Sequence, residues 1–454
     1  MTVLPDLDTR RDTTSAPPSP VTIGGLGEPG TLLLSGPSPE AGPEDLVGHA
    51  SRWGPLPAAD GAGVRALLRD SRLDGRGGGG FALARKVETA RLAPGQPVLI
   101  VNASESETES RKDRSLCAHR PHLVLDGAAL VARALGVDGF VVHVHRGDAP
   151  VGGALGAAVV QRTEAGLDDP AVRLSEGPDR YVAGESSAVA GFVHGGDARP
   201  MFTSSPLAVR GPSGRPTVVT NAETVAQLAV IARIGPVPWN GLGAPSSPGP
   251  RLVTVAGAVP RPGRVLEITG PATLGDVLSA EGVVAPPAAV LVGGFAGTWI
   301  LGDEAWQTPF TRESLACVGA APGCGLVAAL PHDACPLTET ARIVRYLAGE
   351  SAGQCGTCVA GLPRLADSMD SLAGGSARRR DVRRMAGLAD TVLGSGACGH
   401  PDGVVRLIQS TLDVFHDDVV RHLAGGPCRG SDHPPVLVVP DPRPRPTTDP
   451  GAWR

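Results

Sequence analysis

The chain of 454 residues is long enough for two to four domains and a sizeable core. Its formal net charge of −5 and its 3% aromatic content exclude an ordinary nucleic-acid binder, which needs basic patches and stacking platforms. An N-terminal signal and an apolar run long enough for a bilayer are both missing from the sequence, so we expect a cytoplasmic protein with no direct membrane span.

In chain order, residues 1–58 are rich in Pro, Ser, Gly and Thr, which predicts a mostly disordered lead-in. Residues 59–240 then alternate helical and extended patterns, which predicts an α/β domain with a mainly parallel sheet. We expect strands at residues 98–102, 139–144, 171–174 and 181–183, and helices from Val64 and at 122–135, 152–162 and 220–234.

A Pro/Gly/Ser-rich linker at 236–250 leads to a small domain at 250–300, with strands at 252–259, 264–268 and 289–292 and a helix at 273–280. Helical spacing then predicts a four-helix domain over residues 325–426, and a Pro-rich tail over 427–454. Its helices are expected at 336–349, 362–373, 380–393 and 403–423.

Two stretches of the first domain could carry chemistry. The run Gly75-Arg-Gly-Gly-Gly-Gly-Phe81 can turn backbone N–H groups toward a phosphate or a flat ring, although a flexible loop is the ordinary explanation. It matches neither the Walker pattern nor the Rossmann fingerprint. The polar stretch from Asn102 to Arg114 follows an expected strand, and is either a solvated loop or a set of ligands for a polar cofactor.

Together the two stretches resemble the flavin- and NADH-binding subunit of NADH:quinone oxidoreductases, the 51-kDa or F-type subunit. The glycine run matches the Gly-Arg-Gly-Gly-Ala-Gly-Phe motif of that family, and residues 102–114 match its Asn-Ala-Asp-Glu-x-Glu-Pro-Gly-Thr-x-Lys-Asp-Arg motif. Further matches follow in the same order at residues 184–188 and 216–224, and the resemblance extends from about residue 60 to 425.

The resemblance implies an FMN-binding α/β domain, a β-grasp domain that binds a soluble ligand, and a helical iron–sulfur domain. It implies Glu105 and Glu185 as catalytic carboxylates. It also implies that FMN and the dinucleotide are held by Gly75, Arg76, Gly77, Gly78, Gly80, Phe81, Lys86, Asn102, Glu105, Glu107, Tyr181, Gly184, Glu185, Asn221 and Thr224.

Several positions depart from the family motifs. Ser104, Ser186 and Thr220 replace Asp, Glu and Asn, and the lysine-bearing loop beside the dinucleotide has become the sequence at 202–206, which lacks a lysine. Residues 87–89 replace the aromatics expected after Lys86. These changes leave most of the flavin site but predict weakened NADH binding.

A Cys355-x-x-Cys358 pair with Cys398 forty residues later suits an iron–sulfur cluster, because thiolates are the ligands of such clusters. A CxxC pair alone would equally fit zinc, a redox dithiol or chance. The family motif has a fourth cysteine where this chain has Ala352, so the cluster either has three protein thiolates or is absent. We expect a [4Fe–4S] centre with three thiolates that readily becomes [3Fe–4S], ahead of zinc in its place. His400 is either a substitute ligand or an ordinary histidine.

The other thiols in the second half of the chain, those of Cys317, Cys324, Cys335 and Cys428, are interpreted as small buried hydrophobes. Taken together, the sequence predicts a redox subunit that passes electrons from a reduced nicotinamide or another donor through FMN to a cluster. Its partners would be other electron-transfer subunits, in a complex peripheral to a membrane. The alternative is a degenerate scaffold or ligand-binding subunit of a redox complex, which keeps the fold and has lost catalysis.

Overall fold

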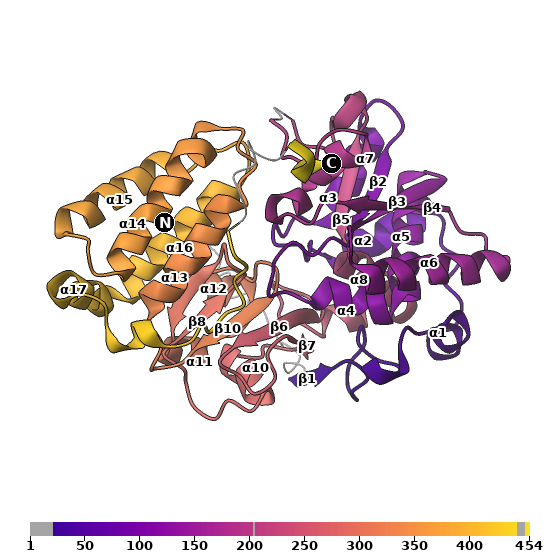
Figure 1. Cartoon of the computed structure of the whole chain (residues 1–454). Coiled ribbons are helices and arrows are strands. Elements are labelled where there is room, and N and C mark those ends of the chain that lie inside the picture. The colour runs from indigo at the N-terminus through magenta and orange to yellow at the C-terminus, as the bar shows by residue number, and fades with distance from the viewer. Residues whose placement is uncertain (1–20, 203–204, 443–449) are drawn as a thin grey trace, which may run out of the picture.

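The computed structural model describes residues 21–202, 205–442 and 450–454. These form an α/β domain, a sheet domain and a helical domain, arranged so that each contacts the other two (Figure 1). The expected disorder of residues 1–20 lies outside the described residues.

The first domain is built on a four-stranded parallel sheet with the strand order β4-β3-β2-β5. Alternate residues of a strand point to opposite faces, and both faces here are covered. Leu99 and Val101 pack into the core with α5 (Pro121–Leu135) and α8 (Ala222–Ile234), whereas Ile100 packs against Val189 of α7 (Ser186–Val193). The strands are β2 (Val98–Asn102), β3 (Gly139–His145), β4 (Ala171–Gly177) and β5 (Thr217–Asn221).

Five helices of this domain were not predicted from the sequence: α3, α4 and α7, together with α1 in the expected lead-in and α9 in the expected linker. The full set is α1 (Leu46–Trp53), α2 (Gly61–Ser71), α3 (Leu83–Leu92), α4 (Lys112–His119), α5 (Pro121–Leu135), α6 (Ala149–Glu164), α7 (Ser186–Val193), α8 (Ala222–Ile234) and α9 (Pro236–Asn240).

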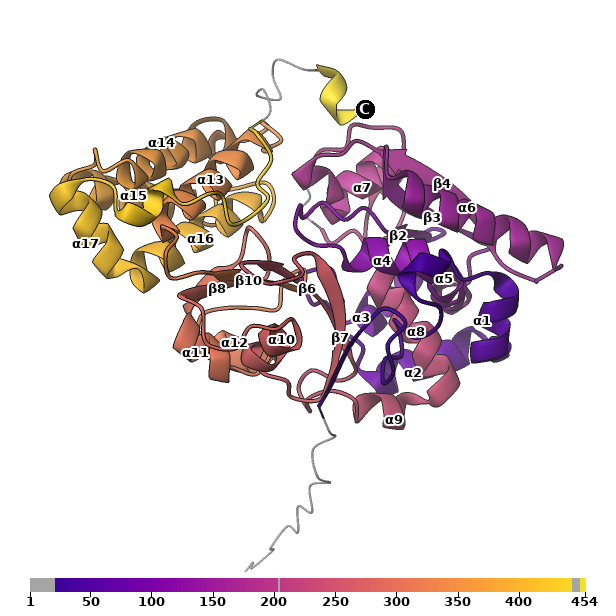
Figure 2. The same cartoon turned by 60° about the horizontal axis from the view of Figure 1, so that its bottom comes forward.

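The second domain is a six-stranded mixed sheet ordered β1-β7-β6-β10-β8-β9. When β6 to β10 are counted along the chain, these five strands lie side by side in the order second, first, fifth, third, fourth, and β10 runs parallel to β6. Helix α10 packs on one face of this sheet (Figure 2). This is the β-grasp arrangement that we expected. The elements are β1 (Thr22–Gly25), β6 (Arg251–Gly257), β7 (Arg264–Thr269), α10 (Leu274–Ala280), β8 (Ala289–Val292), β9 (Thr298–Leu301), α11 (Gly302–Gln307), α12 (Arg312–Cys317) and β10 (Leu326–Leu330).

The N-terminal segment corrects the expected disordered lead-in over the part that the structure describes. β1 pairs antiparallel with β7, Leu33 and Leu34 are fully buried, and Asp45 caps α1 by accepting from Gly48 N. The Glu267 carboxylate accepts the backbone N–H groups of Leu32 and Leu34, each at 3.0 Å. Low-complexity composition therefore hides a segment whose order comes from tertiary contacts.

The third domain contains α13 (Pro336–Gly349), α14 (Leu362–Ala373), α15 (Arg379–Val392), α16 (His400–Val414) and α17 (His416–Gly425). The helix expected at 403–423 is thus divided at Phe415, whose backbone leaves the helical region. The expected boundaries also shift, because β10 is part of the sheet domain. Residues 181–183, expected as a strand, form a short 3₁₀ turn, η2 (Tyr181–Gly184), and β5 precedes the helix expected at 220–234.

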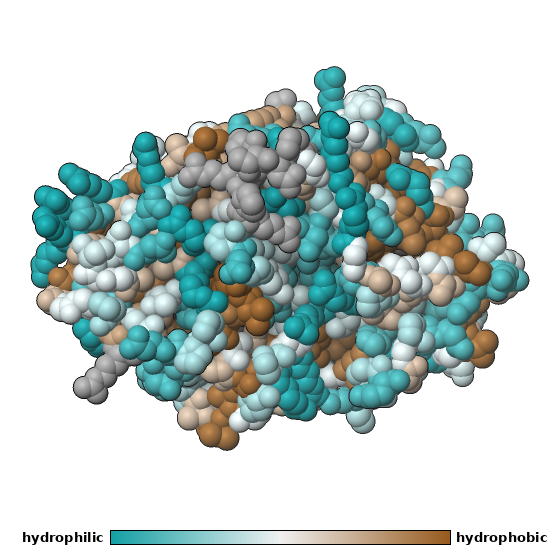
Figure 3. All heavy atoms as spheres, viewed as in Figure 1, coloured by the Kyte–Doolittle hydropathy of each residue, from teal (hydrophilic) through white to brown (hydrophobic). Residues whose placement is uncertain are grey.

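A buried ion pair ties the first and third domains together, with Arg180 Nε 3.1 Å from Glu350 Oε2. Hydrophilic side chains cover much of the face in Figure 3, and its apolar patches are small and dispersed. Among the described residues, no helix is long and apolar enough to cross a membrane.

Candidate flavin and cluster site

A cavity of about 650 Å³ opens where the three domains meet, a size typical of cofactor sites. The glycine run and the carboxyl ends of β2 and β5 form one wall, and residues of the second and third domains form the other. Of the residues predicted from the sequence, the cavity is lined by Gly75, Gly77, Gly78, Gly80, Phe81, Lys86, Asn102, Glu105, Glu107, Tyr181, Gly184, Glu185, Asn221, Thr224 and Cys398.

The glycine run is a closed loop. A bridge between Asp74 and Ala82 joins its ends, and Gly75 N donates to Phe81 O at 2.9 Å. Gly78 and Gly80 have φ of 92° and 61°, in the left-handed region that favours glycine. A Cβ at Gly80 would also stand 2.1 Å from the Arg312 guanidinium. This loop is therefore a formed cradle rather than the flexible linker that composition alone suggests.

Arg76, expected at the cofactor, is not among the residues that line the cavity. Its side chain is buried and pairs with Asp74 at 2.8 Å, and it donates to Pro248 O at 2.8 Å. Its backbone N–H donates to Thr224 Oγ1 at 2.9 Å. Arg76 thus braces the glycine loop from behind.

Lys86 and Phe81 stand at the cavity beside each other. Lys86 Nζ donates to Val219 O at 3.1 Å and lies 5.9 Å from the centroid of the Phe81 ring. Burial lowers the pKa of Lys86. Phe81 is 70% exposed, which leaves its ring free to stack on a ligand.

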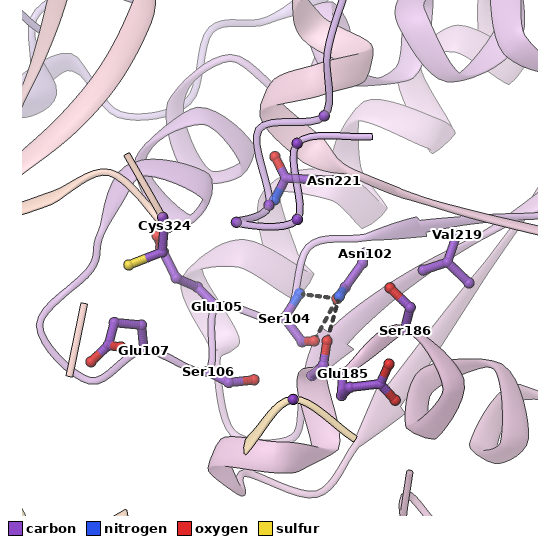
Figure 4. Close-up of a pocket in the computed structure, with 18 of the residues that line it drawn as sticks. Asn102, Ser104, Glu105, Ser106, Glu107, Glu185, Ser186, Val219, Asn221 and Cys324 are labelled. Carbon is purple, nitrogen blue, oxygen red and sulfur yellow. Dashed lines mark hydrogen bonds between the residues drawn. The ribbon is translucent and has the colours of Figure 1, made fainter. Parts of the chain in front are cut away.

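Asn102 ends β2 and organises the loop that follows (Figure 4). Its Nδ2 donates to Gly184 O at 2.9 Å, and its Oδ1 accepts from Ser104 N and Ser104 Oγ at 3.1 and 2.6 Å. Serine at 104, a departure from the family motif, therefore contacts Asn102 and lines the cavity.

Glu105 and Glu185, the two expected catalytic carboxylates, each sit at the start of a helix. Glu105 accepts from Arg114 N at 3.0 Å in α4, and Glu185 accepts from Ser187 N and Ala188 N of α7 at 2.8 and 3.1 Å. Burial, reinforced by the Asp113 carboxylate, raises the pKa of Glu105. Both groups line the cavity, but their oxygens already cap helices, which is a positioning role.

Glu107 has a different environment. Its Oε2 accepts from Phe295 N at 2.9 Å and Tyr181 Oη at 3.1 Å, while its buried Oε1 has no hydrogen-bond partner within the described residues. Burial raises the pKa of Glu107 to about 7. A buried acceptor without a partner is costly, so its place in the cavity wall fits a ligand hydroxyl or amide.

Asn221, at the end of β5, joins a charged network behind the cavity. Its Nδ2 donates to Asp113 Oδ2 at 2.7 Å, and Lys112 Nζ lies 2.7 Å from the same oxygen and 3.1 Å from Glu223 Oε2. Lys112 and Asp113 also line the cavity. The family motif retains both, so the sequence held the signal for these two residues.

The opposite wall holds residues that the sequence reading did not assign. Cys324 follows a glycine in the loop before β10, and Arg406 on α16 donates to Ala296 O at 3.1 Å. Two consecutive glycines at 293–294, directly after the expected strand, were the sequence signal for a loop at this wall. Both have positive φ, which glycine adopts readily. Positions on this wall are Gly293, Ala296, Gly323, Cys324, Gly399, His400 and Arg406.

Of the three expected cluster thiols, Cys398 lines the cavity, and the other two lie in the loop and turn after α13. Cys355 and Cys358 flank the start of a π-helical turn, η4 (Thr357–Gly361), and Cys398 precedes α16. Burial, with the neighbouring Cys355 and Cys398, raises the pKa of Cys358. Three thiols are a donor set of the kind that an iron–sulfur cluster uses.

The fourth corner has no thiol. Ala352 is buried in an apolar cluster with Val182, Ala183, Ala198 and Trp453. Trp453, in the turn η7 (Pro450–Trp453), is fully buried, and Arg180 lies 4.6 Å from its ring centroid. The C-terminal turn thus covers the place of the missing ligand, beside α7 in Figure 1.

His400 lies at the junction of the cavity and the thiols. Its Nε2–H donates to Leu347 O at 2.9 Å in the neutral tautomer that this contact favours, and burial lowers its pKa to about 4. Its Nδ1 has no hydrogen-bond partner among the described residues.

Comparison with known proteins agrees with this geometry. The Nuo51 FMN-binding domain model matches residues 68–230, and the iron–sulfur binding region model of NADH-ubiquinone oxidoreductase F matches residues 338–422. The F-type subunit of NADH-quinone oxidoreductase from Mycobacterium tuberculosis is 29% identical over 393 residues, covering 83% of this chain and 88% of that protein.

Two hydrogenase subunits are also similar. The NAD-reducing hydrogenase HoxS subunit alpha of Cupriavidus necator is 29% identical over 379 residues, covering 79% of this chain and 61% of that protein. A crystal structure of an NAD⁺-reducing [NiFe]-hydrogenase in the H₂-reduced state superposes with a TM-score of 0.75 at 29% identity, covering 81% of this chain. This chain spans 63% of the length of that one.

The fold and site define an electron-transfer subunit with a flavin-binding domain and an iron–sulfur binding region. The chain belongs to the family of NADH:quinone oxidoreductase flavoprotein subunits, as a divergent member. The relatives are subunits of larger complexes, so other subunits are its partners.

Proposed function

We propose that this protein receives electrons at FMN bound in the cavity and passes them to an iron–sulfur cluster held by Cys355, Cys358 and Cys398. The observation that carries the proposal is the single cavity, whose walls include both the glycine loop and Cys398. Bound FMN supplies the exchange between two-electron and one-electron chemistry. The residues of the chain bind and orient the cofactor.

In this proposal, the loop at 75–80 presents backbone amides to the phosphate, and Lys86 adds a positive charge. Asn102 and Glu107 face the polar atoms of the cofactor, and the free Oε1 of Glu107 accepts a hydroxyl. Glu105 and Glu185 hold α4 and α7 in place, so they position the site instead of exchanging protons.

The electron donor would be a reduced nicotinamide or a related carrier that stacks on the exposed Phe81 ring. Binding of NADH would be weak, because the lysine-bearing loop of the family is replaced at 202–206. Residues 203 and 204 of that loop lie outside the described residues. Electrons would leave for a partner subunit in a cytoplasmic complex, attached peripherally to a membrane.

Reconstitution with FMN tests the proposal against a scaffold that has lost its cofactors. We expect the flavin-free protein to bind FMN, and Lys86→Ala to weaken binding by about ten- to a hundredfold, the equivalent of about 1.5–3 kcal/mol for a charged hydrogen bond. Arg85→Ala, at the exposed neighbouring position, is the matched control and should bind as the parent does. Failure of the parent to bind FMN would favour the scaffold.

A further inference from the structure

Three potential metal ligands meet outside the flavin and cluster site, where the chain returns to the helical domain after α17. Cys335 is the residue before α13, His422 lies in the last turns of α17, and Cys428 follows that helix. The Cys335 Sγ, His422 Nε2 and Cys428 Sγ atoms all lie within 4.8 Å of one another. None of the three residues lines the cavity.

The distances suit one mononuclear ion. Cys335 Sγ is 3.5 Å from His422 Nε2. Two ligands on a tetrahedral zinc, with bonds of about 2.3 Å to sulfur and about 2.1 Å to nitrogen, stand about 3.6 Å apart. An iron–sulfur cluster would instead bind each ligand to a different iron atom, which requires wider spacing than this tight group provides.

His422 is held in the tautomer that a metal needs. Its Nδ1 lies 3.2 Å from Leu372 O, so Nδ1–H donates to that carbonyl and the lone pair is on Nε2. Ligating histidines commonly donate their other ring N–H to a carbonyl or carboxylate in this way. Nε2 also accepts from the Cys428 backbone N–H at 3.2 Å.

The thiols have matching surroundings. Cys335 and His422 are each 1% exposed, and Cys335 Sγ accepts from Thr338 N at 3.4 Å at the N-terminus of α13. This N–H and the helix N-terminus can stabilise the negative charge that a metal-bound sulfur carries. Ser431 Oγ, 3.7 Å from Cys428 Sγ, provides an oxygen beside the remaining position.

We propose that Cys335, His422 and Cys428 bind one zinc ion, with the fourth position taken by Ser431 Oγ or by a water that it holds. Binding displaces the thiol protons to solvent and links Cys335, directly before α13, to Cys428 in the segment after α17. The ion therefore connects the start of the helical domain to its end, independently of the cluster.

The cluster thiols must be removed before the test, because they also bind soft metals. We suggest the full chain with Cys355→Ser, Cys358→Ser and Cys398→Ser, titrated with Co²⁺ alone under anaerobic conditions. We expect one Co²⁺ per chain, with the intense d–d bands of a tetrahedral ion and thiolate charge-transfer absorption. Zn²⁺ should displace it, and elemental analysis of the purified parent should find zinc as well as iron.

Adding Cys428→Ser to this background should weaken Co²⁺ binding by more than about 100-fold, because loss of an outer-shell partner alone costs 10–100-fold. Cys428 is partly exposed, so the variant should fold, and circular dichroism verifies this. Adding Cys317→Ser, at an exposed thiol, is the matched control and should change nothing. Absent cobalt bands, unchanged affinity in Cys428→Ser, or a Cys335–Cys428 disulfide in the purified protein would each overturn the proposal.

Discussion

Glu107 shows how a single residue can report on the site. Burial raises its pKa to about 7, from an ordinary value of 4.5. Between these two values the folded protein holds a proton at Glu107 that the unfolded chain releases, so the contribution of Glu107 to the free energy of unfolding falls as pH rises.

We therefore expect Glu107 to lower the free energy of unfolding of the flavin-free protein by up to about 3 kcal/mol between pH 4.5 and pH 7, at 1.36 kcal/mol per pKa unit. Buried histidines such as His400, whose pKa is lowered to about 4, act in the opposite direction, so the effect of Glu107 is measured as a difference between variants. Glu107→Gln cannot ionise, so it should gain stability relative to the parent as pH rises through this window. Thermal melts at several pH values measure the effect. Glu164→Gln, at an exposed glutamate, is the control, and equal slopes in parent and Glu107→Gln would contradict the assignment.

Ala352 leads to a second prediction at this scale. Cysteine is a small apolar residue that fits the same buried cluster, and it would restore the fourth thiolate of the family motif. Ala352→Cys should keep its cluster longer in air than the parent does and give less [3Fe–4S] signal in electron paramagnetic resonance after mild oxidation. Ala165→Cys, an exposed position in the first domain, should behave as the parent.

Sequence reasoning located the cavity residues well where a motif fixed a backbone position, as for Gly78, Asn102 and Asn221. It could not show the direction of a side chain, so Arg76 was assigned to the cavity although its guanidinium lies behind the loop. Cys335, interpreted as a buried hydrophobe, lies beside His422 only through tertiary folding. These two positions are 87 residues apart, and no local spacing joins them.

At the scale of elements, α7 depends on Glu185 for its first turn. Glu185→Ala should lower the free energy of unfolding by about 1 kcal/mol, the usual cost of losing an N-cap, and should reduce FMN content because Gly184 O contacts Asn102. Glu185→Asn provides a good cap without the charge. If the residue acts only by positioning, Asn should restore both stability and flavin content, measured by chemical denaturation and by absorbance.

The long strands and helices were predictable because their hydrophobic patterns are strong, and β2 was predicted to the residue. The missed helices α4 and α7 are eight residues each and rich in polar or small side chains. Glu185, the residue directly before α7, caps that helix, whereas α4 is held by Glu105, which lies seven residues before the helix begins. The contact of Glu105 with α4 depends on how the loop folds back, so the local sequence pattern could not show it.

At the scale of the whole molecule, all three domains contribute residues to the cavity in which an electron donor would bind. We expect NADH to bind about ten- to a hundredfold more weakly than to relatives with the complete motif, since a lost charged contact costs about 1.5–3 kcal/mol. Stopped-flow bleaching of the flavin against NADH concentration measures this. Rapid bleaching at micromolar NADH would show that the divergent loop does not limit binding.

The pairing of β1 with β7 has a practical consequence for handling the protein. A worker guided by composition would trim the chain at residue 58, and would thereby remove the strand that covers the edge of the second sheet. The bared edge of β7 would offer unpaired backbone groups to any neighbouring chain, and buried Glu267 would lose its N–H donors. Trimming for solubility would then produce self-association, visible in sedimentation as species that grow with concentration.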